Sequence, residues 1–136
     1  MADPTNVRSL AVTVDDVVTA VQAREEGRTA VLRATPPFHA RMRARLHVDR
    51  DDADADAIHL DPRDLLDDGT PPFPTPAETE DRLRASDREY TREAHREFHR
   101  EAVAEWRAAA REHVVDGVTL STPDGPHAVA IKPLES

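Results

Sequence analysis

RTAVLRATPPFHARMRARLHV, residues 28–48, is the stretch of sequence that decides the fold. Residues 29–35 are mostly small, aliphatic or β-branched and predict a strand, which the two following prolines end. From residue 40 to residue 48, apolar side chains alternate with charged ones, so a second strand has one buried side and one polar side. The sequence therefore predicts a two-stranded ribbon over 28–48, with its strands antiparallel.

The segments on either side of the ribbon predict a helix and a third strand. Valines at helical spacing follow Thr13, a preferred N-cap residue, and Gly27 comes after the last turn, so we expect a helix over 14–26. After the ribbon, residues 49–57 (DRDDADADA) contain five Asp and predict an exposed acidic loop. A short strand near 58–60 follows it.

The C-terminal half begins with a proline-rich linker, TPPFPTP, at 70–76. Thr75 and Glu78 form a capping box that predicts the start of a long helix over about 76–115. A second capping box, at Ser86, leaves open a break within this helix.

The last segment predicts a β-hairpin over 118–132, because apolar residues flank the turn sequence Thr-Pro-Asp-Gly. The whole chain, 1–136, thus predicts a single α+β domain with a small, mainly antiparallel sheet backed by helices.

The composition is acidic and lacks cysteine. There are 27 acidic and 18 basic side chains, which give a net charge of −9, and Lys132 is the only lysine. We interpret this bias as an adaptation to high salt, in which the repulsion between like charges is screened. Without cysteine there is no disulfide, thiolate nucleophile or cysteine metal site. The N-terminus has no signal-like apolar stretch and no segment is long enough to span a membrane, so we expect a cytoplasmic protein.

The polar side of the second predicted strand carries His39, Arg41, Arg43, Arg45 and His47. Period two places all five on one face, and Arg33 lies on the neighbouring strand. Because residues 28–48 contain five Arg and no acid, this face predicts a local positive surface. Arg can bind a phosphate with two parallel hydrogen bonds, and a two-stranded ribbon fits the DNA major groove. The alternative is that the Arg stripe forms an internal ion-pair network with the acidic loop or with the long helix.

Two histidines one turn apart, His95 and His99, can chelate a transition metal. The HExxH pattern of zinc proteases is absent, however, and the sequence identifies no third ligand. The alternative is that both are half-buried where the helix packs on the sheet.

The first part of the predicted long helix suggests a surface for a protein partner. Leu83 is the only large aliphatic residue in 76–92, and Tyr90 lies about 160° around the helix from Trp106. One flat surface cannot bury both aromatic residues. We therefore expect the region around Leu83 and Tyr90 to project and to meet another copy of the chain or a different protein.

Motifs of common enzymes are missing. The four glycines are too scattered for a dinucleotide or phosphate loop, and no serine lies in a GxSxG pattern. We expect a non-enzymatic protein without a cofactor.

Two segments, LAVTVDDVVTAVQAREEGRTAVLRATPPFHARMRARLHV (10–48) and IHLDPRDLL (58–66), resemble a family of small haloarchaeal proteins of unknown function. The resemblance implies an archaeal, cytosolic origin and carries no activity with it.

The sequence therefore supports three hypotheses. The first is a binding or regulatory module that contacts nucleic acid or another polyanion through its Arg-rich strand face. The second is an interaction or assembly module that uses the long charged helix. The third is a metal protein with histidine ligands.

Overall fold

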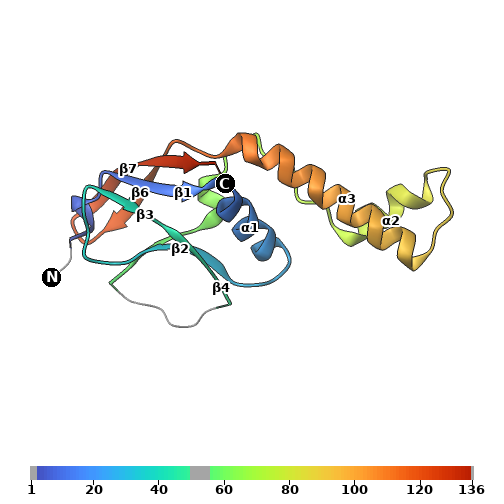
Figure 1. Ribbon diagram of the computed structural model, residues 1–136, viewed down its shortest axis with the longest axis horizontal. Coiled ribbons are helices and arrows are strands. Elements are labelled where there is room, and N and C mark those ends of the chain that lie inside the picture. The colour runs from blue at the N-terminus through green and yellow to red at the C-terminus, as the bar shows by residue number, and fades with distance from the viewer. Residues whose placement is uncertain (1–2, 50–55, 136) are drawn as a thin grey trace.

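The computed structural model describes residues 3–49 and 56–135, which form an α+β fold as predicted (Figure 1). In chain order the elements are η1 (Pro4–Asn6), β1 (Ser9–Thr13), α1 (Val14–Glu25), β2 (Ala30–Ala34), β3 (Arg41–Arg43), β4 (Arg45–Val48), β5 (Ile58–Leu60), η2 (Pro62–Leu65), α2 (Pro76–Arg84), α3 (Arg92–Ala110), η3 (Arg111–His113), β6 (Gly117–Thr122) and β7 (Gly125–Leu134). Most of the predicted acidic loop, residues 50–55, lies outside the described residues.

The strands form a four-stranded sheet with the order β3-β1-β7-β6 and a three-stranded sheet with the order β4-β2-β5. β1 runs parallel to both of its neighbours, and the other pairs are antiparallel. The ribbon predicted over 28–48 therefore holds for β4, which pairs with β2. It does not hold for β3, which pairs with β1, a strand that the sequence did not indicate.

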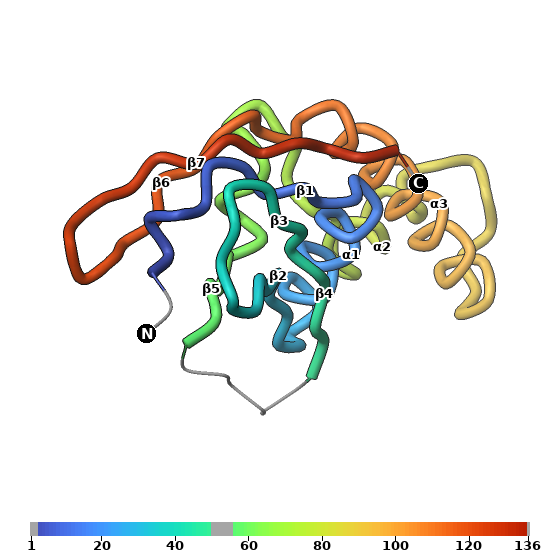
Figure 2. The backbone as a smooth tube through the Cα atoms, turned by 60° about the vertical axis from the view of Figure 1, so that its left-hand side comes forward, coloured from blue at the N-terminus to red at the C-terminus, as the bar shows by residue number. Residues whose placement is uncertain are grey.

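Residues 41–48 connect the two sheets. The N–H of Ala44 donates to the carbonyl of Ala11 in β1 (3.0 Å), while the N–H of Asp49 donates to the carbonyl of Thr29 beside β2 (2.9 Å). Even and odd residues of an extended strand direct their backbone groups to opposite edges. β1 and β2 therefore lie on opposite edges of this segment, and the sheets continue into each other around a bend (Figure 2).

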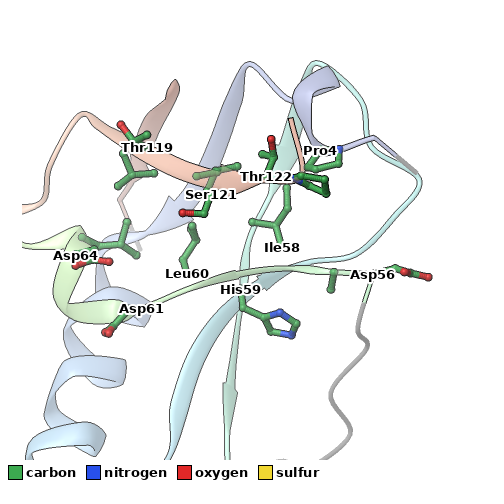
Figure 3. Close-up of a pocket in the computed structure, with 15 residues that line it drawn as sticks. Pro4, Asp56, Ile58, His59, Leu60, Asp61, Asp64, Thr119, Ser121 and Thr122 are labelled. Atoms are coloured by element: carbon green, nitrogen blue, oxygen red, sulfur yellow. The ribbon is translucent and has the colours of Figure 1, made fainter. Parts of the chain in front are cut away.

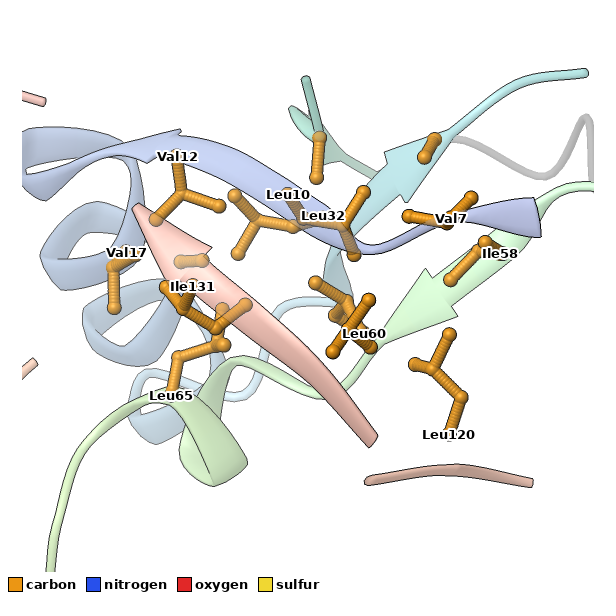
Figure 4. Close-up of a cluster of buried hydrophobic side chains, with 14 of the residues drawn as sticks. Val7, Leu10, Val12, Val17, Leu32, Ile58, Leu60, Leu65, Leu120 and Ile131 are labelled. Atoms are coloured by element: carbon orange, nitrogen blue, oxygen red, sulfur yellow. The ribbon is translucent and has the colours of Figure 1, made fainter. Parts of the chain in front are cut away.

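One hydrophobic core fills the inner side of both sheets (Figure 4). Leu10 and Ile131 come from the four-stranded sheet, and Leu32 and Leu60 come from the three-stranded sheet. α1 covers this core, as the sequence predicts, with Val17 among the fully buried side chains. Because the inner faces of both sheets contribute side chains to the same core, their other faces point outward.

The ends of α1 and the C-terminal hairpin follow the sequence signals. Thr13 Oγ1 accepts a hydrogen bond from the N–H of Asp16 (3.2 Å), and Gly27, with φ of 85°, follows the last turn. Gly125, the first residue of β7 after the turn, also has a positive φ, 108°. The predicted hairpin over 118–132 is confirmed, with one to two more residues at each end.

The single helix predicted over 76–115 is wrong, because α2 and α3 are separate helices that form a hairpin (Figure 1). α3 begins at Arg92, directly after its N-cap Thr91, whose Oγ1 accepts a hydrogen bond from the N–H of Ala94 (2.9 Å). Ser86 does not start a helix; its hydroxyl donates to the carbonyl of Leu83 (2.6 Å). The open alternative of a break at Ser86 was therefore correct, although the second helix begins later than the second capping box indicated.

The base of this hairpin packs against the rest of the protein. Trp106 packs edge-on against Phe73, with ring centroids 4.9 Å apart, and its Nε1 donates to the carbonyl of Pro71 (2.9 Å). Arg107 donates to Gln22 of α1 (2.8 Å). The distal half of α3, with α2, extends away from the sheets (Figure 1). No helix in the described part of the chain is long and apolar enough to cross a bilayer.

Leu83 is fully buried where α2 packs on α3, so its truncation should open the hairpin. We expect Leu83→Ala to destabilise the α2–α3 contact by about 2–5 kcal/mol. Hydrogen exchange should then accelerate in α2 and in the distal turns of α3, while the strands keep their protection. Asp81→Asn, at an exposed position of the same helix, is the control and should leave exchange unchanged. Uniform loss of protection would contradict an arm that opens independently.

Candidate anion-binding face

The strands and the rest of the chain differ in charge. The strand residues include five cationic side chains and no carboxylate, although the whole chain contains 27 acidic side chains. The cationic residues are Arg33, Arg41, Arg43, Arg45 and Lys132. Because no acidic residue lies in a strand of the described structure, the sheets are the basic part of an acidic protein.

Arg41, Arg43 and Arg45 are all exposed on the outer side of residues 41–48. The core includes Met42, Ala44 and Leu46, which alternate with the three arginines along the chain. Because side chains of an extended strand point to alternate sides, the three guanidinium groups point outward. The predicted common face is thus present, although β3 and β4 belong to different sheets.

The three arginines form no ion pair and no side-chain hydrogen bond with any described residue. Other arginines of the protein do form ion pairs: Arg24, Arg28, Arg63, Arg84 and Arg111. The distances include 2.8 Å between Arg28 and Asp49 and 3.1 Å between Arg63 and Glu25. Within the described ranges, no ion pair of the alternative network forms around this face; most of the acidic loop that the alternative names, residues 50–55, lies outside those ranges.

The strand register extends the face in both directions. Ala11 of β1 lies opposite Arg43, and Lys132 of β7 lies opposite Ala11. Arg33 of β2 lies opposite Arg45, and His59 of β5 lies on the other side of Arg33. Residues paired in register point to the same side of a sheet. Lys132 and His59 are therefore members of this face that the ribbon alone could not reveal, since their strands are distant in sequence.

The other predicted members differ in exposure. His39 is exposed but precedes β3, and His47 is half-buried and lies opposite Val31. Arg33 is 7 % exposed, in contrast to its neighbour Arg45. The structure thus brings Arg33, Arg45 and His47 onto one sheet and Arg41 and Arg43 onto the other.

Leu83 and Tyr90, the residues expected to meet a protein partner, pack within the helix hairpin. The region around Leu83 projects from the sheets as expected (Figure 1), but Leu83 itself is fully buried inside the helix hairpin and is not available to a partner. Tyr90 is half-buried; its hydroxyl donates to Glu80 (3.0 Å), and the guanidinium of Arg84 lies 3.8 Å from its ring centroid. Both side chains hold α2 and α3 together because the chain turns back where a longer helix was expected.

His95 and His99 lie between the two helices and share one hydroxyl. Thr79 Oγ1, which is fully buried, lies 2.9 Å from His95 Nε2 and 3.0 Å from His99 Nδ1. His95 Nε2 is also 3.0 Å from the carbonyl of Pro76. Because a carbonyl can only accept, Nε2 of His95 carries a proton when it bonds to Pro76. Both histidines are half-buried, but they lie between two helices and not where a helix packs on the sheet.

This arrangement does not resemble a metal site. One ring nitrogen of each histidine, Nε2 of His95 and Nδ1 of His99, is within hydrogen-bonding distance of the Thr79 hydroxyl. Among the described residues, no group of three His, Cys, Asp or Glu side chains could hold a metal ion. A transition metal needs further ligands of this kind. The geometry accounts for both histidines as hydrogen-bonding partners of a buried threonine.

A groove of about 580 Å³ lies between β5 and β6 (Figure 3). Leu60, Leu65 and Leu120 supply apolar surface, while Asp64 and Ser121 contribute polar groups. Figure 3 shows His59 pointing away from this groove, on the other side of β5 from Ile58 and Leu60. The groove and the cationic face are therefore on opposite sides of β5.

Replacement of the Thr79 hydroxyl tests its part in the hairpin. We expect Thr79→Val to lower the free energy of unfolding by about 1–2 kcal/mol in urea titrations, because both imidazoles lose a buried partner. Thr79→Ser keeps the hydroxyl and should be less destabilising than Thr79→Val. Equal or greater stability of the valine variant would show that the histidines do not depend on this hydroxyl.

Comparisons with known proteins add a family and no activity. No curated protein and no solved structure matches the chain. A family model described as a domain of unknown function, DUF8009, matches residues 1–135. This match covers almost the whole chain, and the protein belongs to the DUF8009 family.

Proposed function

We propose that the protein is a non-enzymatic module that binds the phosphate backbone of a nucleic acid, or a similar polyanion, through its cationic sheet face. The observation that supports this most directly is the row of Arg41, Arg43 and Arg45. All three are exposed and without an ion-pair partner among the described residues, whereas several arginines elsewhere are paired. Guanidinium groups that form no ion pair within the described part of an acidic protein are suited to an external anion.

The spacing of the row suits a chain of phosphates. Side chains two residues apart on a strand are separated by about 6.6 Å along it. This is similar to the separation of successive phosphates along one strand of a nucleic acid. Each guanidinium can bind a phosphate with two parallel hydrogen bonds. Three arginines in line can thus contact three successive phosphates.

The rest of the face favours contacts to the backbone over base stacking. None of the five aromatic Phe, Tyr and Trp residues lies in a strand. Single-strand binding proteins stack bases on such side chains. Beside the arginines, Ser9 and Ala11 of β1 are small and allow a polyanion to approach the sheet closely.

The setting that fits this composition is the cytoplasm of a halophilic archaeon. The support is the acidic surplus and the single lysine among 18 basic residues. Non-specific phosphate binding weakens steeply with salt. In such a setting, only several well-matched contacts, such as an arginine row, would retain a nucleic acid.

No observation favours the assembly hypothesis. Interfaces between proteins contain an apolar centre. Among the described residues, the only exposed large hydrophobic side chain is Leu134, at the end of β7.

Fluorescence polarisation of labelled duplex DNA, duplex RNA and single strands tests the proposal, from about 0.5 M KCl to near saturation. We expect Arg43→Ser/Arg45→Ser to weaken binding about tenfold or more and to reduce the salt slope by about 1.8, or 0.9 per lost phosphate contact.

Arg92→Ser/Arg96→Ser is the matched control, because it removes the same charge from exposed positions of α3. Equal weakening by the control would indicate a general charge effect, and absence of binding by the wild type at every salt concentration would refute the proposal.

A further inference from the structure

Arg33 is a buried cation without a counter-ion in the described structure. It occupies the central strand of the β4-β2-β5 sheet and is only 7 % exposed. Its Nε is fully buried and has no hydrogen-bond partner. No carboxylate among the described residues forms an ion pair with it.

The cross-strand neighbours of Arg33 are also basic. Arg45 and His59 lie opposite it on the two flanking strands, with side chains about 5 Å apart at the β-carbons. Leu32 and Ala34 point into the core, so Arg33 points to the outer face. His59 also points to this face, since it lies on the other side of β5 from Ile58 and Leu60 (Figure 3).

Such an arrangement is costly unless an anion is present. Arginine keeps its positive charge in proteins, so burial leaves Arg33 with an uncompensated charge. A buried charge without a partner is destabilising, and like charges directly opposite each other on a sheet repel. An anion placed between the three side chains would remove both penalties and would satisfy the donors that Arg33 leaves unused.

We propose that Arg33, Arg45 and His59 form a binding site for one tetrahedral oxyanion, a phosphate group. This inference rests on the proposed function, because Arg45 belongs to both, and it assigns a defined phosphate position to the face. Arg33 supplies a fixed guanidinium at the base of the site, while Arg45 and His59 supply donors from either side. The phosphate can belong to a nucleic-acid backbone or can be free inorganic phosphate.

The test uses the full chain and inorganic phosphate, with KCl adjusted to keep the ionic strength constant. A bound ligand stabilises the folded state, so the melting temperature of the wild type should rise by about 5 °C for each tenfold increase in phosphate above the dissociation constant. Arg33→Met keeps the apolar length of the side chain and should abolish this rise. Arg45→Ser changes an exposed position and should reduce the rise in melting temperature. This second variant keeps the proposal testable if Arg33→Met fails to fold.

Arg63→Met is the matched control, because Arg63 is an exposed arginine of η2 that pairs with Glu25. It should keep the full phosphate response. A response that is equal in phosphate and chloride, or that survives in both Arg33→Met and Arg45→Ser, would overturn the site.

Oligonucleotide binding separates the two sources of phosphate. Weaker oligonucleotide binding by Arg33→Met would assign the site to a backbone phosphate, and unchanged binding with a lost phosphate response would assign it to free phosphate. If oligonucleotides bind through Arg43 and Arg45 but phosphate has no effect on any variant, the proposed function stands and this site fails. If phosphate stabilises the protein but no oligonucleotide binds, the site stands without the proposed function.

Discussion

The structure depends on the burial of Ala44, at the point where one extended segment leaves one sheet and enters the other. Its side chain is fully buried, and its N–H bonds to Ala11 of β1. A larger side chain here would have to displace core residues of both sheets, since packed cores leave little free volume. The change of partner also fixes the outer face: alternation continues through Ala44, so arginines from two sheets stay in one row.

The sequence predicted the local elements well and the long-range pairing poorly. α1 was predictable from Thr13 and Gly27, and the last hairpin from its turn sequence, because these signals are local. β1 has the alternating pattern SLAVT, but it runs directly into the helix without a turn residue. Its parallel partners, β3 and β7, are distant in the chain, and such pairings leave no mark in a single sequence.

For the candidate site too, the sequence predicted what depends on local alternation and missed what depends on long-range pairing. Period two was enough to place Arg41, Arg43 and Arg45 together, since it needs only a strand with one buried side. Lys132 and His59 lie on the same face only because of the register in which β7 pairs with β1 and β5 pairs with β2. The burial of Arg33 could not be foreseen either, because a lone arginine on a strand reads as exposed. For Leu83, the sequence predicted one continuous helix that begins at the capping box of Thr75 and Glu78, whereas the reversal at 85–91 depends on packing between α2 and α3.

The absence of carboxylates from the strands has a consequence for how the protein meets a charged molecule. The α2–α3 hairpin, residues 76–110, carries nine acidic and seven basic side chains, so charges of the two signs nearly cancel there. Arg41, Arg43 and Arg45 have no such compensation within their own strands. The range of their attraction for a polyanion is about one Debye length, which is about 30 Å at 0.01 M salt and about 3 Å at 1 M salt. The arginine row would therefore orient an approaching polyanion in dilute buffer and would act only on contact in concentrated salt.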